Sequence, residues 1–457
     1  MRVPMRIRAT IANTKEQGFS SGAANLLALI VGIGTEFTVH FVGELYLSEI
    51  LLLIVFPFLL VLRGKRVLRP ELKTIYSLMG LWLIGVVVSD AYNHIDTFDR
   101  MRGTAIIVFF AINLLCMSML LGGNSRRMMI YFIGLIVGSL ASCKLQPSPA
   151  FVDYPWKFGY SFGTIPLVML IASYFYDRRR YGISTIFIFG ICAANLLVNY
   201  RSPVLDTLVV FVLVYPVIPE RMGGIQILPR SVLARLLILA VLAVVAGETA
   251  GAMVNLVTRA GYVNEQNQAK NEAQAKDGGL LLGGRPEFVI GLRAALEHPI
   301  IGHGSWAKDY KYLEMLQDLE IETGALDYSP DFENGTNGLI PAHSSIVTAW
   351  IWAGITGLIF WIYMAWYILR AISRVAIIRP PLAPFYMWFL ISTWWNIFFS
   401  PFAANRRMIE AVLIVFVADL MQKKVSLVRG RWRRLGATNL RRPHRLRNQS
   451  FAPPRTL

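Results

Sequence analysis

The chain contains many long runs of apolar residues, among them NLLALIVGIG, LLLIVFPFLLVL and LLILAVLAVVAG. They are too apolar and too numerous for the core of one soluble domain, and a helix that crosses a bilayer needs roughly 20 such residues. The composition agrees, because only 16% of the residues are charged, whereas soluble domains carry about 25%. The sequence therefore predicts an all-α polytopic membrane protein.

The apolar runs divide the chain into about twelve predicted transmembrane helices and five regions. The predicted spans lie near 22–41, 44–62, 73–90, 103–121, 127–144, 162–176, 182–199, 203–218, 231–250, 343–369, 383–400 and 406–421. The regions are a cytoplasmic N-terminus at 1–21, nine helices within 22–250, a large periplasmic loop at 251–342, three helices within 343–421, and a basic cytoplasmic tail at 422–457.

Positive charge is distributed unevenly between the connections. Most of the 45 lysines and arginines lie in alternate connections and in the two terminal segments, and cytoplasmic loops of membrane proteins collect such residues. We therefore expect both termini in the cytoplasm and the large loop on the outer side. The same bias accounts for the net charge of +17 without a nucleic-acid partner. No small-residue cleavage signal follows the first apolar run, so we expect an uncleaved first span.

The large loop carries its own helical pattern. Apolar residues recur at helical spacing within 286–297, which predicts a short amphipathic helix. Pro299 and the glycines of IIGHG end it. A second helix is expected at 305–319, with Trp306, Tyr310 and Leu313 on one face.

Three residues are candidates for chemistry, and each has a simpler alternative. Arg285 follows two glycines, and its planar guanidinium matches phosphate oxygens, although residue type alone favours a pair with a loop carboxylate. Arg201 interrupts two apolar spans, where a charge usually lines a cavity or extends to the membrane interface. His343 opens span ten and is suited to accept a proton near neutral pH, or it simply faces water at a helix start.

The remaining polar residues favour structural roles. His298 and His303 are five residues apart with no third ligand in the pattern, so turn and packing roles are favoured over a metal site. No Asp-x-Asp stands in an outer loop, and the patterns of a P-loop, GxSxG or CxxC are absent. We predict no metal and no cofactor. Three glutamates near the predicted outer span ends could bind polar ligand groups, but solvation at the interface is favoured. Three cysteines in or beside apolar runs are expected to be buried thiols. They are Glu36, Glu44, Glu49, Cys116, Cys143 and Cys192.

Taken together, these residues resemble the superfamily of O-antigen ligases and O-antigen polymerases, which are bacterial membrane glycosyltransferases with a GT-C-like helical fold. The resemblance covers the layout of the chain and is most specific over about 285–360. The matching elements are Gly284-Arg285, the turn Pro299-Ile-Ile-Gly302-His-Gly304, His343 at the start of a span, Gly354-Ile-Thr-Gly357 within it, and Arg201 between two mid-chain spans.

Two positions depart from the family pattern. The histidine is commonly followed by Asn, but Ser344 stands here, and the aromatic residue expected a turn after the loop arginine is present only as Phe288. These departures indicate a side branch of the superfamily and leave open whether the chain is a polymerase or a ligase, with a slight preference for a polymerase or exopolysaccharide assembly.

The resemblance implies a mechanism without metal. The donor would be a glycan on undecaprenyl diphosphate, and the acceptor would be another glycan or lipid A–core, within the bacterial inner membrane and its lipids. Arg201 and Arg285 would bind the diphosphate leaving group, and His343 would take the proton of the acceptor hydroxyl for attack with inversion. The alternative functions are a lipid-linked glycan flippase or sugar transporter, although the two similar halves typical of transporters are not apparent, and a structural scaffold.

Overall fold

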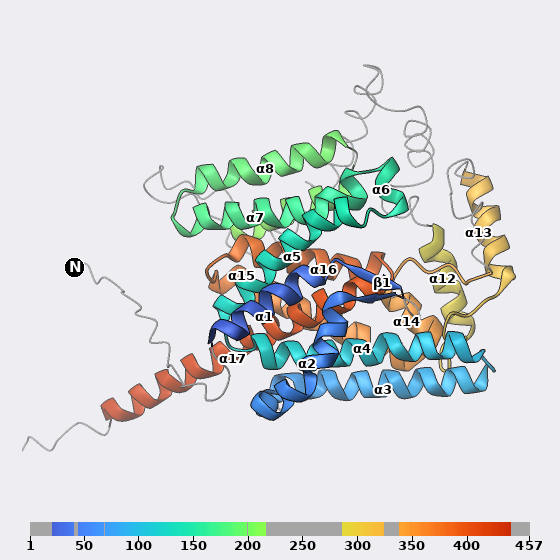
Figure 1. Cartoon of the computed structure of the whole chain (residues 1–457), viewed down its shortest axis with the longest axis horizontal. Coiled ribbons are helices and arrows are strands. Elements are labelled where there is room, and N and C mark those ends of the chain that lie inside the picture. The colour runs from blue at the N-terminus through green and yellow to red at the C-terminus, as the bar shows by residue number, and fades with distance from the viewer. Residues whose placement is uncertain are drawn as a thin grey trace, which may run out of the picture.

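The computed structural model describes residues 21–40, 44–67, 69–198, 200–215, 286–323 and 338–439 of the 457-residue chain. The described chain is mostly helical (Figure 1). Its helices are α1 (Ser21–Gly34), α2 (Leu47–Arg63), α3 (Pro70–Tyr92), α4 (Thr97–Leu121), α5 (Ser125–Leu145), α6 (Pro149–Asp153), α7 (Ser161–Asp177), α8 (Tyr181–Leu197), α9 (Arg201–Val214), α12 (Pro286–Glu297), α13 (Tyr310–Thr323), α14 (Ser345–Ala353), α15 (Ile355–Ile378), α16 (Ala383–Phe399) and α17 (Ala404–Asn439).

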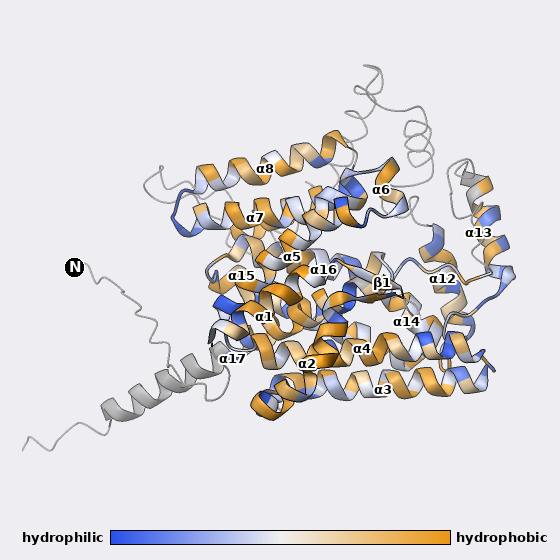
Figure 2. Ribbon diagram, in the orientation of Figure 1, coloured by the Kyte–Doolittle hydropathy of each residue, from blue (hydrophilic) through white to orange (hydrophobic). Residues whose placement is uncertain are grey.

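Five helices in the described part of the chain are long and apolar enough to cross a membrane, which confirms the membrane class. They are α3, α4, α15, α5 and the combined helix Trp156–Asp177, which joins the π-helical turn η2 (Trp156–Tyr160) to α7. Figure 2 shows hydrophobic residues along the bundle, whereas hydrophilic residues gather on α13 and the nearby ends of α3 and α4. The predicted span 231–250 lies outside the described residues, and every other predicted span contains helix.

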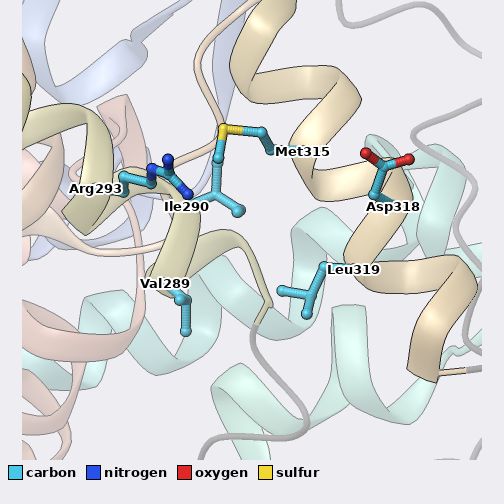
Figure 3. A pocket seen from close by; sticks show the side chains of 6 residues that line it. All are labelled: Val289, Ile290, Arg293, Met315, Asp318 and Leu319. Atoms are coloured by element: carbon cyan, nitrogen blue, oxygen red, sulfur yellow. The ribbon is translucent and has the colours of Figure 1, made fainter.

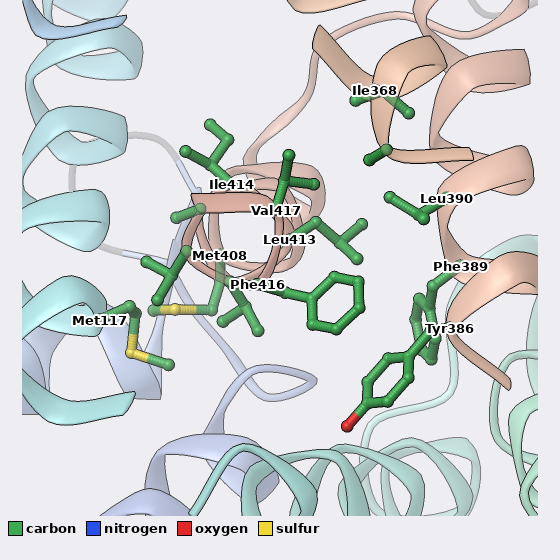
Figure 4. Packing of buried hydrophobic residues seen from close by; sticks show 14 of the residues in the cluster. Met117, Ile368, Tyr386, Phe389, Leu390, Met408, Leu413, Ile414, Phe416 and Val417 are labelled. Carbon is green, nitrogen blue, oxygen red and sulfur yellow. The ribbon is translucent and has the colours of Figure 1, made fainter. Parts of the chain in front are cut away.

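Helix α17 provides much of the apolar core. It contacts α4, α15 and α16, and Figure 4 shows its side chains packed between Met117 of α4 and Tyr386 of α16. The rings of Tyr386 and Phe416 stack with their centroids 4.2 Å apart. Cys116, Cys143 and Cys192 are buried free thiols, as predicted.

The first predicted span is too long, because α1 ends at Gly34 and a short hairpin follows. Strands β1 (Thr38–His40) and β2 (Glu44–Tyr46) pair in antiparallel register, which is a small exception to the all-α prediction. The hairpin delivers the chain to α2, whose first turn contains Glu49.

The expectation that Glu49 is solvated is wrong. Its side chain is 1% exposed, and its carboxylate accepts two bonds from Arg407, from Nε at 2.9 Å and from Nη2 at 2.7 Å. Asn113 Nδ2 and the backbone N–H of Tyr46 donate to the same carboxylate, and Arg407 also donates to the Glu44 carbonyl. A charge is tolerated here because it is paired and hydrogen-bonded. Glu44 itself is exposed, and Glu36 is half-buried.

The tenth predicted span, 343–369, is not one helix but two. The chain breaks at Gly354, with φ +59° and ψ −146°, a conformation that L side chains rarely adopt. An unbroken helix would bond the Ile355 N–H to the Ile351 carbonyl. Instead Ile355 donates to the Ile300 carbonyl at 3.2 Å, and the Ile351 carbonyl accepts from the N–H of His303 at 2.6 Å.

The turn Pro299–Gly304 therefore occupies the break between α14 and α15, so two motifs that are distant in the sequence form one structural unit. Gly302 lies so close to the break that a Cβ would stand 2.6 Å from the Ile351 carbonyl oxygen. Because the two backbones approach this closely, glycine is required on the turn as well as at Gly354.

The acid-rich connection between α3 and α4 holds the same turn. Asp90 accepts from the backbone N–H of Ser305 at 2.6 Å and from its hydroxyl at 3.0 Å, and Asn93 donates to the Gly302 carbonyl. Lys308 reaches Asp99 at 2.8 Å. The turn is thus fixed to α3, α4, α14 and α15 together.

The loop helix predicted at 286–297 is confirmed as α12, and the predicted helix at 305–319 begins later, as α13 at Tyr310. Ser305 and Trp306 form a turn, and Lys308 forms an isolated antiparallel β-bridge with Leu339. Trp306 has φ +53° and packs on Trp352 rather than on a helix face. Tertiary hydrogen bonds replace helical ones here, so the helical spacing of the apolar residues was misleading.

Candidate functional site

The Phe399 end of α16 is a meeting point for several segments. Phe288, in the first turn of α12, lies 6.1 Å from Phe399 between ring centroids. Ser344 donates from Oγ to the Ile397 carbonyl, and Ser345 Oγ donates to the Ser400 carbonyl at 2.8 Å. The starts of α12 and α14 therefore both lie at this end of α16, which we call the α12 end of the bundle.

His343 lies at the α12 end and is exposed. It immediately precedes Ser344, the N-cap of α14, whose side chain accepts from the Val347 N–H. The segment before it packs on α12, where Gly291 approaches Pro341 so closely that a Cβ would stand 2.7 Å from the Pro341 carbonyl oxygen. The imidazole is therefore carried by a backbone that both α12 and α16 hold in place.

Arg201 is the first residue of α9 and is half-buried. The turn before it is fixed, because the Tyr200 N–H donates to the Asn195 carbonyl at 2.8 Å. The Asn195 side chain in turn accepts from Trp156 Nε1 at 3.0 Å. Contacts from α8 and η2 thus fix the backbone position of Arg201 at the start of α9.

Helices α9 and α16 run antiparallel. The end of α9 lies near Tyr176, whose hydroxyl donates to the Val214 carbonyl, and the next residue, Asp177, accepts from the N–H of Leu382 at the start of α16. Arg201, at the other end of α9, therefore lies at the α12 end of the bundle, as His343 does. Arg285 lies outside the described residues, and the described chain resumes at Pro286.

Sequence reasoning missed a group of polar residues around Tyr200, the neighbour of Arg201 in the chain. Arg406 interacts electrostatically with Glu410 and Tyr200, and Tyr200 interacts with Asp206. Asp206 is buried on α9 and hydrogen-bonds Ser392 of α16. The available signal was the presence of charged residues inside an apolar segment, which usually marks a cavity or a functional site.

The polar atoms of this group do not all satisfy one another. Glu410 is 4% exposed, and its Oε2 has no hydrogen-bond partner within the described structure. Buried polar atoms of native proteins are nearly always satisfied, so this atom points to a water, a proton or a ligand. Arg407, the neighbour of Arg406 in the chain, is in contrast paired with the Glu49 carboxylate and donates to the Glu44 carbonyl.

The two loop histidines have packing roles, as the sequence favoured. The rings of His298 and His303 meet edge to face at 4.5 Å, and His303 Nε2 donates to the Ala294 carbonyl at 2.9 Å. Burial is the largest influence on His303 and holds its pKa below the ordinary value. Within the described ranges, no group of three or more His, Cys, Asp or Glu side chains is placed to hold a metal.

A groove lies between α12 and α13, with a volume of about 310 Å³. Figure 3 shows apolar side chains from both helices around it, with Arg293 on α12 and Asp318 on α13. The groove is lined by Val289, Ile290, Arg293, Met315, Asp318 and Leu319. It lies on the far side of α12 from Gly291 and is separate from the residues around Phe399.

Comparison with known proteins adds no family assignment. No protein-family model matches the chain, and no curated protein matches its sequence. The functional interpretation therefore rests on the residues and their placement.

Proposed function

We propose that the protein is an inverting glycosyltransferase of the bacterial inner membrane that transfers or polymerises a glycan carried on undecaprenyl diphosphate. In this proposal the chain has twelve spans, both termini are cytoplasmic, and the loop 251–342 lies in the periplasm. The product is an O-antigen or exopolysaccharide chain, made by a polymerase or a ligase. The observation that carries the proposal is the position of Arg201 and His343 at one end of the bundle, around the Phe399 end of α16.

The diphosphate is the leaving group, and cations beside it lower the barrier because negative charge develops there. Arg201 would bind it with Arg285, which is bonded to the first residue of α12. We add Arg406 as a third cation, because it interacts with Tyr200, the neighbour of Arg201 in the chain. Each guanidinium offers several donors in a planar fork that suits phosphate oxygens.

His343 would accept the proton of the acceptor hydroxyl as that oxygen attacks the anomeric carbon. The C–O bond to the diphosphate breaks on the opposite face, so the configuration inverts and undecaprenyl diphosphate leaves with the bonding electron pair. The exposed position of His343 supports this role, because an acceptor must reach the imidazole. No metal is required in this scheme.

Transport is the competing function, and the helix break at Gly354 is the observation that favours it. Transporters often bind substrate at the unpaired backbone groups of broken helices. Here the turn occupies those groups, because Ile300 and His303 bond both sides of the break. The break is thus already satisfied within the protein, which favours a structural reason for it.

The decisive experiment supplies purified protein in detergent with a lipid-linked glycan donor. A glycosyltransferase yields a new glycosidic bond without any membrane gradient, whereas a transporter yields no new bond. We expect His343→Ala to abolish product, and Arg201→Ala to lower the rate at least ~100-fold, the scale of losing one transition-state donor. Separate reactions with a glycan acceptor and with lipid A–core distinguish polymerase from ligase.

Two controls make this result interpretable. Arg201→Lys keeps the charge but loses the fork, so full activity of that variant would rule out bidentate recognition. Added chelator should leave the rate unchanged, and a metal-dependent rate would refute the arginine-based scheme.

A further inference from the structure

Helix α15 has one apolar face that no other described part of the chain covers. Over its first fifteen residues the exposed large residues recur three and four apart, which is the spacing of one helix face. They are Ile355, Ile359, Ile362, Trp366 and Leu369. Because α15 is one of the helices long and apolar enough to cross a membrane, this face is the surface that contacts lipid chains.

The exposed face of α15 continues onto the turn next to its first residue. The Ile355 N–H donates to the Ile300 carbonyl, so the two backbones are in contact. The Ile300 side chain is 70% exposed, although it is large and apolar. The exposure of Ile300 is explained if its side chain contacts lipid, as the adjoining face of α15 does.

The same surface extends onto α12. Val289, Arg293 and Leu296 share one exposed face of this helix, and Leu296 is 57% exposed. The opposite face, with Ile290 and Ala294, is buried against the neighbouring helices. Figure 1 shows α12 running at a steep angle to α3 and α4 rather than alongside them.

Two further residues match the chemistry of a membrane interface. Arg293 stands between Val289 and Leu296. Its Nε lies 3.6 Å from Glu297 Oε1, but its side chain remains 60% exposed, so the guanidinium can also meet a lipid phosphate while the apolar neighbours enter the leaflet. Trp350 is half-buried, and its indole N–H donates to the Pro299 carbonyl at 2.9 Å. Tryptophan is enriched at membrane–water interfaces, where its ring is in the apolar layer and its N–H is bonded.

The geometry points to an interfacial helix: α12 and the turn after it lie on the phospholipid leaflet, with Leu296 and Ile300 inserted among the lipid chains and Arg293 at the phosphate level. This inference depends on the membrane class alone and not on the proposed reaction. It fixes α12 at headgroup depth, where a membrane-anchored substrate carries its phosphates.

The test uses single cysteines at Leu296 and Ile300, labelled with a fluorophore in phospholipid vesicles. Both side chains are exposed, so the substitutions leave the packing intact. Spin-labelled lipids quench fluorophores at a known depth in the bilayer, whereas iodide quenches fluorophores that are exposed to water. We expect shallow lipid quenchers to reduce the emission at both positions at least twofold, with little effect of iodide.

Two matched positions calibrate the measurement. A label at Ile362, in the middle of the α15 stripe, should respond to deep lipid quenchers. A label at Glu314, an exposed polar residue of α13 that does not line the groove shared with α12, should respond to iodide. If labels at Leu296 and Ile300 respond to iodide as Glu314 does, the face is in water and the inference is wrong. If neither quencher reaches them, protein covers the face, and the inference is again wrong.

Discussion

Arg406 and Arg407 are neighbours in the chain, yet the structure predicts opposite consequences for their replacement. Arg407 is 3% exposed and is paired with Glu49, which is 1% exposed. The Arg407→Ala variant leaves that carboxylate buried with only Asn113 and a backbone N–H as donors. It should therefore unfold more easily, with activity lost in proportion to the unfolded fraction.

The magnitude follows from the burial of the pair. Removing one partner of a buried, hydrogen-bonded ion pair costs about 3–5 kcal/mol. At about 2.1 cal/mol/K of unfolding entropy per residue, a chain of 457 residues loses roughly 1 °C of Tm per kcal/mol. The Tm of Arg407→Ala should therefore fall by about 3–5 °C, measured by intrinsic tryptophan fluorescence during heating in detergent.

Two further variants separate this stability effect from function. Arg406→Ala should lower the Tm by less than Arg407→Ala does and should lower the transfer rate, because Arg406 interacts electrostatically with Glu410 but forms no ion pair as close as that of Arg407 within the described residues. Replacing Arg407 and Glu49 together by Leu removes the unpaired charge and should recover part of the lost Tm. A Tm of Arg407→Ala close to that of the unchanged protein, or a double variant less stable than the single one, would refute the reasoning.

Two other predictions concern the turn at the helix break. Gly354→Ala places a Cβ 2.0 Å from the Ile300 carbonyl oxygen at a positive φ, so backbone strain alone should cost on the order of 1–3 kcal/mol and lower the Tm. Gly190→Ala is the control, because its Cβ meets nothing within 4 Å, and it should not lower the Tm. Equal Tm values for the two variants would contradict this account. Burial holds the pKa of His303 below its ordinary value, so the folded turn favours the neutral imidazole. The folded turn therefore has its full stability above about pH 6.5. Below that pH its stability falls, because a turn that has opened and exposed His303 binds a proton more readily than the folded turn does. Hydrogen exchange of this turn, corrected for intrinsic rates, should accelerate from pH 7.5 to 5.5, and a His303→Gln variant should lose that acceleration.

Much of the fold was predictable because hydropathy is a local property. A run of apolar residues is driven out of water whatever its neighbours are, so the membrane class and the approximate helix ranges follow from the sequence. The helix at 286–297 was equally predictable, because its apolar spacing, its terminal proline and the following glycines all act within a few residues.

The candidate site was predictable only in part. Arg201 and His343 stood out as charged or ionisable residues at the ends of apolar segments, and both lie at the α12 end of the bundle. Arg406 and Glu410 did not stand out, because an Arg-Arg pair before an apolar run looks like a simple interface charge. Their importance depends on Tyr200, which is distant in the sequence and adjacent only after folding.

The sequence by itself determined which segments leave water and where helices form, since each residue's transfer to lipid and each turn's backbone preference are nearly independent of the rest of the chain. Only the tertiary structure decided which buried charges are neutralised and where a helix breaks. Glu49 is stable in the interior because Arg407 reaches it, and span ten divides at Gly354 because the turn at Ile300 supplies the missing hydrogen bonds. Both depend on partners far along the chain, and a hydrogen bond or ion pair acts only at contact distance.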